Sequence, residues 1–136
     1  MKNDRLELVT NFANKYLGKS VRDGECVALF RQYMEEVFKI PHTGSVEGAY
    51  DLWTTYEKNP KMQKYFERIE GKPEPGDAAI FRPVSTNKYG HVAIVIAVNE
   101  NGVRCVEQDG FKKGLGTKEA FWNWDRYAGA LRAREA

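Results

Sequence analysis

The stretch DGECVALFRQYMEEVF, residues 23 to 38, contains both a recognisable helix and the first candidate for chemistry. Its opening Asp-Gly-Glu is prone to turns, and the apolar residues that follow recur at helical spacing, so it predicts a helix that begins at Cys26 and extends to Lys39. A helix N-terminus carries about half a positive charge and unpaired N–H groups, which favour a thiolate and can also bind a developing oxyanion. Cys26 therefore occupies a position suited to a thiolate nucleophile.

A thiolate nucleophile needs a base, and the chain offers two histidines. His91 opens the run HVAIVIAV, which is rich in β-branched residues and predicts a buried strand. A histidine at the first position of a strand has a fixed Cα and can point into a cleft at the sheet edge, which suits proton transfer. His42 lies in a loop between Pro41 and Thr43, and we predict no catalytic role for it.

A hairpin should return the chain to His91. The sequence Asn99-Glu100-Asn101-Gly102 is a strong turn signal, so the next strand, GVRCVEQDG, is predicted to pair antiparallel with the strand that His91 opens. Glu107 and Asp109 then fall within a couple of residue pairs of His91, and period two places both carboxylates on one face. One of them could accept the imidazole N–H, fix its tautomer and stabilise the imidazolium.

Composition predicts one compact domain over residues 1–136, since 42% of the residues are hydrophobic and 12% are aromatic. The net charge of +2 is too small, and the lysines and arginines are too scattered, to indicate nucleic acid. No stretch is long enough to span a membrane, and the N-terminal MKNDRLELVTNF carries acids where a signal peptide would have an apolar core. We expect a monomer made in the host cytoplasm, with neither nucleic acid nor membrane as a partner.

The order of the expected elements predicts an α+β fold. Helices are expected first, at 4–17, 26–39 and 50–59, the last ending before Pro60. Strands are expected at 78–82, 91–98, 103–108 and 128–132, with a further one at 68–70. This order predicts N-terminal helices packed on an antiparallel β-sheet.

Five segments of the chain follow one another in a characteristic order: GECVALFRQYMEE (24–36), GDAAIF (76–81), YGHVAIV (89–95), VEQDG (106–110) and YAGALR (127–132). This order is similar to that of CHAP domains, the cysteine- and histidine-dependent amidohydrolases and peptidases of phage endolysins and bacterial wall hydrolases. The chain resembles this family over nearly its whole length. The resemblance implies a papain-like core in which Cys26 is the nucleophile and His91 the general base and acid. It also implies that Glu107 is the orienting carboxylate and that Asp109, where endolysin relatives often have asparagine, takes a supporting place.

The resemblance also bears on metals and cofactors. Some relatives carry an acidic calcium loop just before the cysteine, but the stretch SVRDGE, residues 20–25, supplies too few oxygen ligands for calcium. The two histidines and two cysteines are far apart in sequence and give no zinc spacing, so we expect no metal and no cofactor. Both Cys26 and Cys105 are expected as free thiols, because a disulfide between them would consume the nucleophile.

The tryptophans and the second thiol are less specific signals. Trp53, Trp122 and Trp124 could line a groove for sugars or peptides, and among them we favour Trp53 as a cleft residue. Cys105 shares strand parity with Glu107, but we expect it to pack in the core.

The resemblance implies that the chain hydrolyses an amide bond of bacterial peptidoglycan at the cell wall through a thioester. That bond is either the link between muramic acid and L-alanine or a peptide bond of the stem or cross-bridge, and the sequence does not distinguish amidase from endopeptidase. Two other classes stay open. One is a papain-like module that binds wall or protein without cutting it, and the other is a glycosidase that would use Glu107 and Asp109 as its carboxylate pair.

Overall fold

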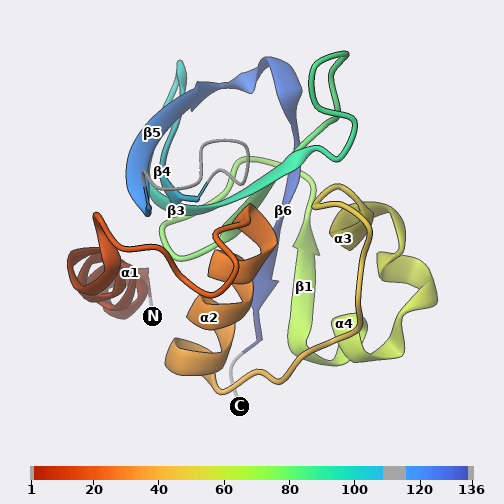
Figure 1. The fold of residues 1–136 in the computed structure, drawn as a ribbon, viewed down its shortest axis with the longest axis horizontal. Helices are drawn as coiled ribbons and strands as arrows, with labels where there is room; N and C mark the ends of the chain where they lie inside the picture. The colour runs from red at the N-terminus through yellow and green to blue at the C-terminus, as the bar shows by residue number, and fades with distance from the viewer. Residues whose placement is uncertain (1, 109–115, 135–136) are drawn as a thin grey trace.

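The computed structural model describes residues 2–108 and 116–134, and it has the predicted α+β architecture (Figure 1). Two long helices come first, α1 (Lys2–Tyr16) and α2 (Cys26–Phe38). Within the described residues, six strands form one antiparallel sheet in the order β1-β6-β2-β3-β4-β5. The strands are β1 (Phe66–Ile69), β2 (Ala78–Phe81), β3 (His91–Asn99), β4 (Gly102–Glu107), β5 (Lys118–Asn123) and β6 (Tyr127–Ala133).

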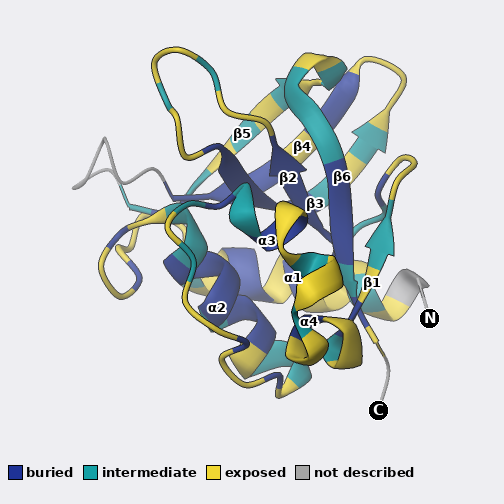
Figure 2. Cartoon of the chain, turned by 90° about the vertical axis from the view of Figure 1, so that its right-hand side faces the viewer, coloured by how far each residue is buried: buried dark blue, intermediate teal, exposed yellow. Residues whose placement is uncertain are grey.

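Helix α2 is held by the face that it buries. The side chains on this face are almost fully buried, and they are Leu29, Phe30, Tyr33 and Met34. The helix ends at Phe38, where Lys39 adopts a left-handed conformation with a φ of 59°. Figure 2 shows how little of α2 is exposed compared with the outer loops. Because the helix is fixed along its length, its first residue, Cys26, is fixed as well.

In the part of the chain that the structure describes, no helix has the length and hydropathy needed to cross a membrane.

Side chains alternate along the strands, and the central strands bury side chains on both faces of the sheet. The core cluster that includes the helices takes one set of these side chains, among them Ala78, Ile80, Val92 and Ile94. A second cluster on the other face consists of Ala79, Phe81, Ala93, Val95, Val103 and Cys105. Trp122, Trp124 and Tyr127 pack against this second cluster.

The predicted hairpin joins β3 to β4, with Val98 opposite Val103 next to the turn. The register then shifts between Val95 and Ala97, so that Val95 pairs with Cys105. A one-residue shift moves every later side chain to the other face of its strand. The shift therefore puts His91 on the same face as Glu107.

The prediction of one helix at 50–59 is wrong. The chain forms α3 (Asp51–Thr54), a short 3-10 helix η1 (Tyr56–Lys58) and then α4 (Pro60–Tyr65). Pro60 begins a helix instead of ending one, because a proline at the first helical position loses no hydrogen bond. Asn59 caps this helix with its side chain.

Strand β5 was not predicted, although it pairs with β4 along its whole length. Its residues alternate between half-buried and exposed, as in an edge strand, so its sequence lacks the long apolar run that marks a buried strand. The pairing sets Lys118 opposite Glu107 and Trp122 opposite Val103. A single 3-10 turn, η3 (Trp124–Arg126), leads from β5 into β6.

Replacing Asn59 by alanine should lower the free energy of unfolding by about 1 kcal/mol, because the side chain accepts the N–H groups of Lys61 and Met62 at 3.1 and 3.2 Å. Asn59→Asp keeps the acceptor and removes only the donor to the Thr43 carbonyl, so it should lose less. Chemical denaturation of the three proteins measures the differences. An alanine variant as stable as the wild type would contradict the cap.

Candidate active site

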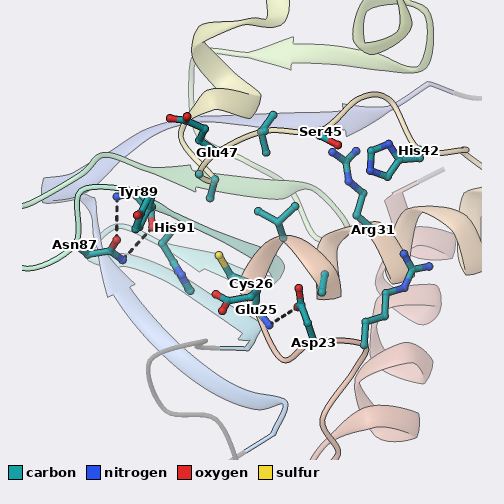
Figure 3. Close-up of a pocket in the computed structure, with 17 residues that line it drawn as sticks. Asp23, Glu25, Cys26, Arg31, His42, Ser45, Glu47, Asn87, Tyr89 and His91 are labelled. Carbon is teal, nitrogen blue, oxygen red and sulfur yellow. Dashed lines mark hydrogen bonds between the residues drawn. The ribbon is translucent and has the colours of Figure 1, made fainter.

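A cleft of about 660 Å³ opens at the N-terminus of α2 (Figure 3). Its walls come from the turn and first residues of α2, the segment before α3, and the loop that leads into β3. The lining side chains include Cys26, Arg31, His42, Glu47, Tyr89 and His91. The sulfur of Cys26 points toward the ring of His91. The cleft therefore brings the predicted nucleophile and base to one place.

Cys26 is the first residue of α2, as predicted, and it is partly exposed. The turn before it uses left-handed backbone at Arg22 and Gly24, with φ values of 54° and 86°. The Asp23 carboxylate accepts the Glu25 N–H at 2.9 Å and closes this turn. In the described part of the chain nothing accepts a hydrogen bond from the Cys26 N–H, so this donor is available to a ligand.

His91 is the first residue of β3 and is only 6% exposed. Gly90 precedes it with a φ of 73°, and a Cβ atom at Gly90 would lie 2.6 Å from the Phe81 carbonyl oxygen. Asn87 fixes the same loop, since its side chain donates to the Gly90 carbonyl and accepts the Tyr89 N–H, each at 3.0 Å. The backbone thus sets the direction from which His91 enters the cleft.

Glu107 holds His91 by a hydrogen bond between Oε1 and the imidazole Nε2, 3.0 Å apart. Trp122 Nε1 donates to the same oxygen at 2.7 Å, and Lys118 Nζ lies 3.8 Å from Oε2. Burial by itself would raise the pKa of Glu107, but its hydrogen bond to His91, the charge of His91, the Trp122 donor and the Lys118 charge lower it. Glu107 is therefore an ionised carboxylate although it is only 3% exposed.

The imidazole is also held by aromatic rings. Its centroid lies 5.1 Å from that of Trp122, with 32° between the planes. Trp122 in turn stacks on Phe81 at 4.8 Å. Trp122 therefore positions both the ring of His91 and the carboxylate of Glu107.

The protonation of His91 depends on its two neighbours. Burial lowers the pKa of His91, but hydrogen bonds with Cys26 and Glu107, and the negative charge of both, raise it to about 9. Because Nε2 is engaged by Glu107, Nδ1 is the nitrogen left for Cys26. The ring is thus set to carry a proton between the cleft and the thiol.

Gln108 connects the end of β4 to the turn before Cys26. Its side-chain oxygen accepts the Val21 N–H, and its Nε2 donates to the Val21 and Glu25 carbonyls at 3.1 and 3.0 Å. The side chain is 1% exposed, so these bonds are shielded from water. Two adjacent residues, Glu107 and Gln108, therefore orient the imidazole and hold the cysteine turn.

The structure brings together Cys26, His91 and Glu107, three of the predicted site residues. The fourth, Asp109, lies outside the described residues. Cys105 is fully buried in the second core cluster, as predicted, and burial raises the pKa of its thiol. Cys26 and Cys105 are both free thiols.

The prediction that Trp53 lines the cleft is wrong. Trp53 packs in the core, where a Cβ atom at Gly129 would lie 2.1 Å from its ring, and Arg68 covers the ring at 3.9 Å. The tryptophan that contacts the predicted site residues is Trp122, and its hydrogen bond to Glu107 could not be predicted from the sequence. The adjacent aromatic residues Phe121 and Trp122 are the sequence signal that favours a strand here.

His42 lines the cleft, and its Nδ1 accepts the Gly44 N–H at 3.1 Å. Among the described residues, no three side chains of His, Cys, Asp or Glu come together as metal ligands. Before Cys26, Asp23 and Glu25 are the two acids, and Asp23 is already used by the Glu25 N–H. Two carboxylates do not fit calcium, which takes about six to eight oxygen ligands.

A thiol at a helix N-terminus, beside a strand histidine that a buried carboxylate orients, defines a papain-like cysteine site on an α+β fold. The CHAP domain family matches residues 16–109, which include Cys26, His91 and Glu107. This match covers more than half of the chain. The chain belongs to the CHAP domain family.

Solved structures show the same fold. Ly7917 aligns with a TM-score of 0.69 and 20% identity over 98% of this chain and 62% of its own, and one of its crystal structures holds the hydrolyzing product of MDP. The wild-type endolysin LysIME-EF1 aligns with a TM-score of 0.69 and 21% identity over 98% of this chain and 64% of its own. The chain thus spans less than two thirds of either protein. No curated protein sequence matches it.

The raised pKa of His91 makes stability depend on pH. In the unfolded chain a histidine has a pKa near 6.5, and in the folded protein that of His91 is about 9. The stability that protonated His91 contributes is therefore fully present below pH 6.5 and is lost as the pH rises through 9. The difference in free energy of unfolding between wild type and His91→Asn should shrink over this range. Urea denaturation at several pH values measures it, and a constant difference would contradict the coupling.

Proposed function

We propose that the chain hydrolyses an amide bond of bacterial peptidoglycan by a thiol mechanism, as an N-acetylmuramoyl-L-alanine amidase or an endopeptidase. The observation that carries this proposal is the hydrogen-bonded pair of His91 and Glu107 beside Cys26 in an open cleft. Membership of the CHAP domain family and the fold shared with an endolysin support it. In this proposal residues 1–136 are a single catalytic domain, made in the cytoplasm and acting on the cell wall.

The first half of the reaction forms a thioester. His91 Nδ1 holds the proton that it has taken from Cys26, and the thiolate sulfur attacks the carbonyl carbon of the scissile amide. The N–H of Cys26 stabilises the oxyanion, a contact worth about a hundred- to a thousandfold in rate at comparable sites. When the C–N bond breaks, His91 gives its proton to the departing amine.

The second half releases the acid. His91 takes a proton from water, the hydroxide attacks the thioester carbonyl, and the C–S bond breaks. The sulfur leaves as the thiolate and recovers the proton from His91. Glu107 stays ionised throughout, keeps the ring aligned and stabilises the imidazolium.

The surface around Cys26 suits an extended polymer. A second depression of about 480 Å³ adjoins the cleft and shares Glu47, Gly48 and Tyr89 with it. Tyr89 is 44% exposed between the two. A chain bound across both depressions would keep bulky groups on either side of the bond to be cut.

The other two classes differ in what they require. A glycosidase needs two carboxylates that reach the sugar. Glu107 is buried, and its Oε1 is hydrogen-bonded to both His91 and Trp122. A binding module would need no oriented imidazole. Products separate all three classes, because amide cleavage frees amines, glycosidase action frees reducing ends, and a binding module frees neither.

Cys26→Ala should abolish release of amines from purified peptidoglycan without lowering the melting temperature, because Cys26 lies at the edge of the core. Cys105→Ala is the matched control: it removes the other thiol and should keep the activity while losing some stability. Amine release and thermal unfolding are measured on each, and mass spectrometry of the fragments identifies the bond. Undiminished amine release by a folded Cys26→Ala protein would overturn the proposal.

Trp122→Phe should lower kcat by about tenfold and leave KM nearly unchanged, because it removes the donor to Glu107 but keeps a ring against His91. Losing this donor also raises the pKa of Glu107, so the acidic limb of the pH–rate profile should move to higher pH.

The control is Trp124→Phe, since Trp124 Nε1 donates to the Glu100 carbonyl, away from the site. Its pH–rate profile should coincide with that of the wild type. Coincident profiles for all three proteins would show that Trp122 does not position Glu107.

A further inference from the structure

Arg31 lies in the wall of the cleft, on α2, and is 8% exposed. Figure 3 shows its guanidinium beside the ring of His42 and close to Ser45, at the end of the cleft away from His91. A side chain that is buried in the protein but borders an open cleft can meet a ligand without moving. This end of the cleft has no part in the proposed proton transfers.

In the described part of the chain, the hydrogen bonds of the Arg31 guanidinium go to neutral oxygens. Nη1 donates to the Thr43 hydroxyl at 2.8 Å, and Nη2 donates to the Gly44 carbonyl at 2.5 Å. Among the described residues no carboxylate lies within ion-pairing distance of it. A guanidinium carries five N–H donors and stays charged, so donors and a full positive charge remain for a ligand.

Arg22 also lines the cleft, and its ion pair contrasts with the surroundings of Arg31. Its guanidinium binds the Glu35 carboxylate at 3.0 Å and Gln32 at 3.1 Å. Arg22 therefore has a counter-ion at the surface, whereas none of the residues that the structure describes supplies one to the buried Arg31. Burying a charge without a counter-ion is unfavourable, and an anionic ligand that pairs with the charge removes that penalty.

Charges along the cleft favour one direction for an anionic ligand. Glu25 lies beside Cys26, and Glu47 lies on the opposite wall (Figure 3), so both would repel a carboxylate near the thiol. At the other end, the charge of Arg31 lowers the pKa of His42 and keeps that ring neutral. An anion is thus directed to Arg31, and the uncharged amide is left for Cys26.

We infer that Arg31 forms a subsite for a carboxylate of the stem peptide of the substrate, an inference that rests on the proposed function. Stem peptides carry free carboxylates, and a planar guanidinium binds one through two parallel hydrogen bonds. The subsite would fix which part of the stem lies at this end of the cleft. Arg31 is therefore a specificity residue and takes no part in the chemical step.

The experiment uses three soluble probes: an N-acetylmuramoyl tetrapeptide with free isoglutamate and terminal carboxylates, and two versions in which one or the other is amidated. Calorimetry on the Cys26→Ala protein measures binding of each probe, and amine release by the otherwise wild-type protein measures cleavage. Amidation of one of the two carboxylates should weaken binding about 10- to 100-fold and raise KM similarly. The amidated probe that binds more weakly identifies which carboxylate Arg31 binds.

Arg31→Gln should bind all three probes alike, and Arg22→Gln, the matched control in the same cleft, should discriminate as the wild type does. Arg31→Lys keeps the charge without the planar fork and should lose most of the discrimination, which decides the case if Arg31→Gln does not fold. Equal binding of all probes by the Cys26→Ala protein, or undiminished discrimination by a folded Arg31 variant, would overturn the inference. If the protein cleaves all three probes equally well, the proposed function stands and the subsite is wrong. If it binds the probes with different affinities but cleaves none of them, the subsite stands and the proposed function is wrong.

Discussion

The site depends on one buried carboxylate. Glu107 is 3% exposed, and its charge is met by two donors on one oxygen, His91 and Trp122. An unpaired charge at this depth would be costly, so β3, β4 and β5 have to lie in the one register that brings these donors to it. The next residue, Gln108, binds the turn before Cys26. One segment thereby sets the positions of sulfur, imidazole and carboxylate together.

A single irregularity in the hairpin makes this arrangement possible. If the residue pairs continued from the turn without a register shift, His91 and Glu107 would lie on opposite faces of the sheet. The register shift between Val95 and Ala97 brings both to the face of Phe81 and Cys105. The same face supplies the aromatic rings that hold the imidazole, so the fold and the site share one cluster of side chains.

Much of this could be predicted from local sequence. The turn at 99–102 fixed the hairpin, the spacing after Gly24 fixed the start of α2, and the order of elements fixed the α+β class. What could not be predicted depends on tertiary contacts. An edge strand such as β5 lacks the long apolar run of a buried strand. Trp53 packs against Gly129, which is 76 residues away in the sequence. The register shift in β3 leaves no mark in the continuous apolar sequence of that strand. The hydrogen bond of Trp122 to Glu107 can therefore be assigned only from the folded sheet.

The central claim is that Cys26 forms a thioester with the acyl part of its substrate, and hydroxylamine tests it most directly. A thioester is attacked by hydroxylamine as well as by water, so the acyl fragment should appear partly as its hydroxamic acid. The hydroxamate fraction, measured by mass spectrometry, should rise with hydroxylamine concentration. Cleavage that yields only the carboxylic acid at every concentration would mean that water attacks the amide directly, and it would contradict the account.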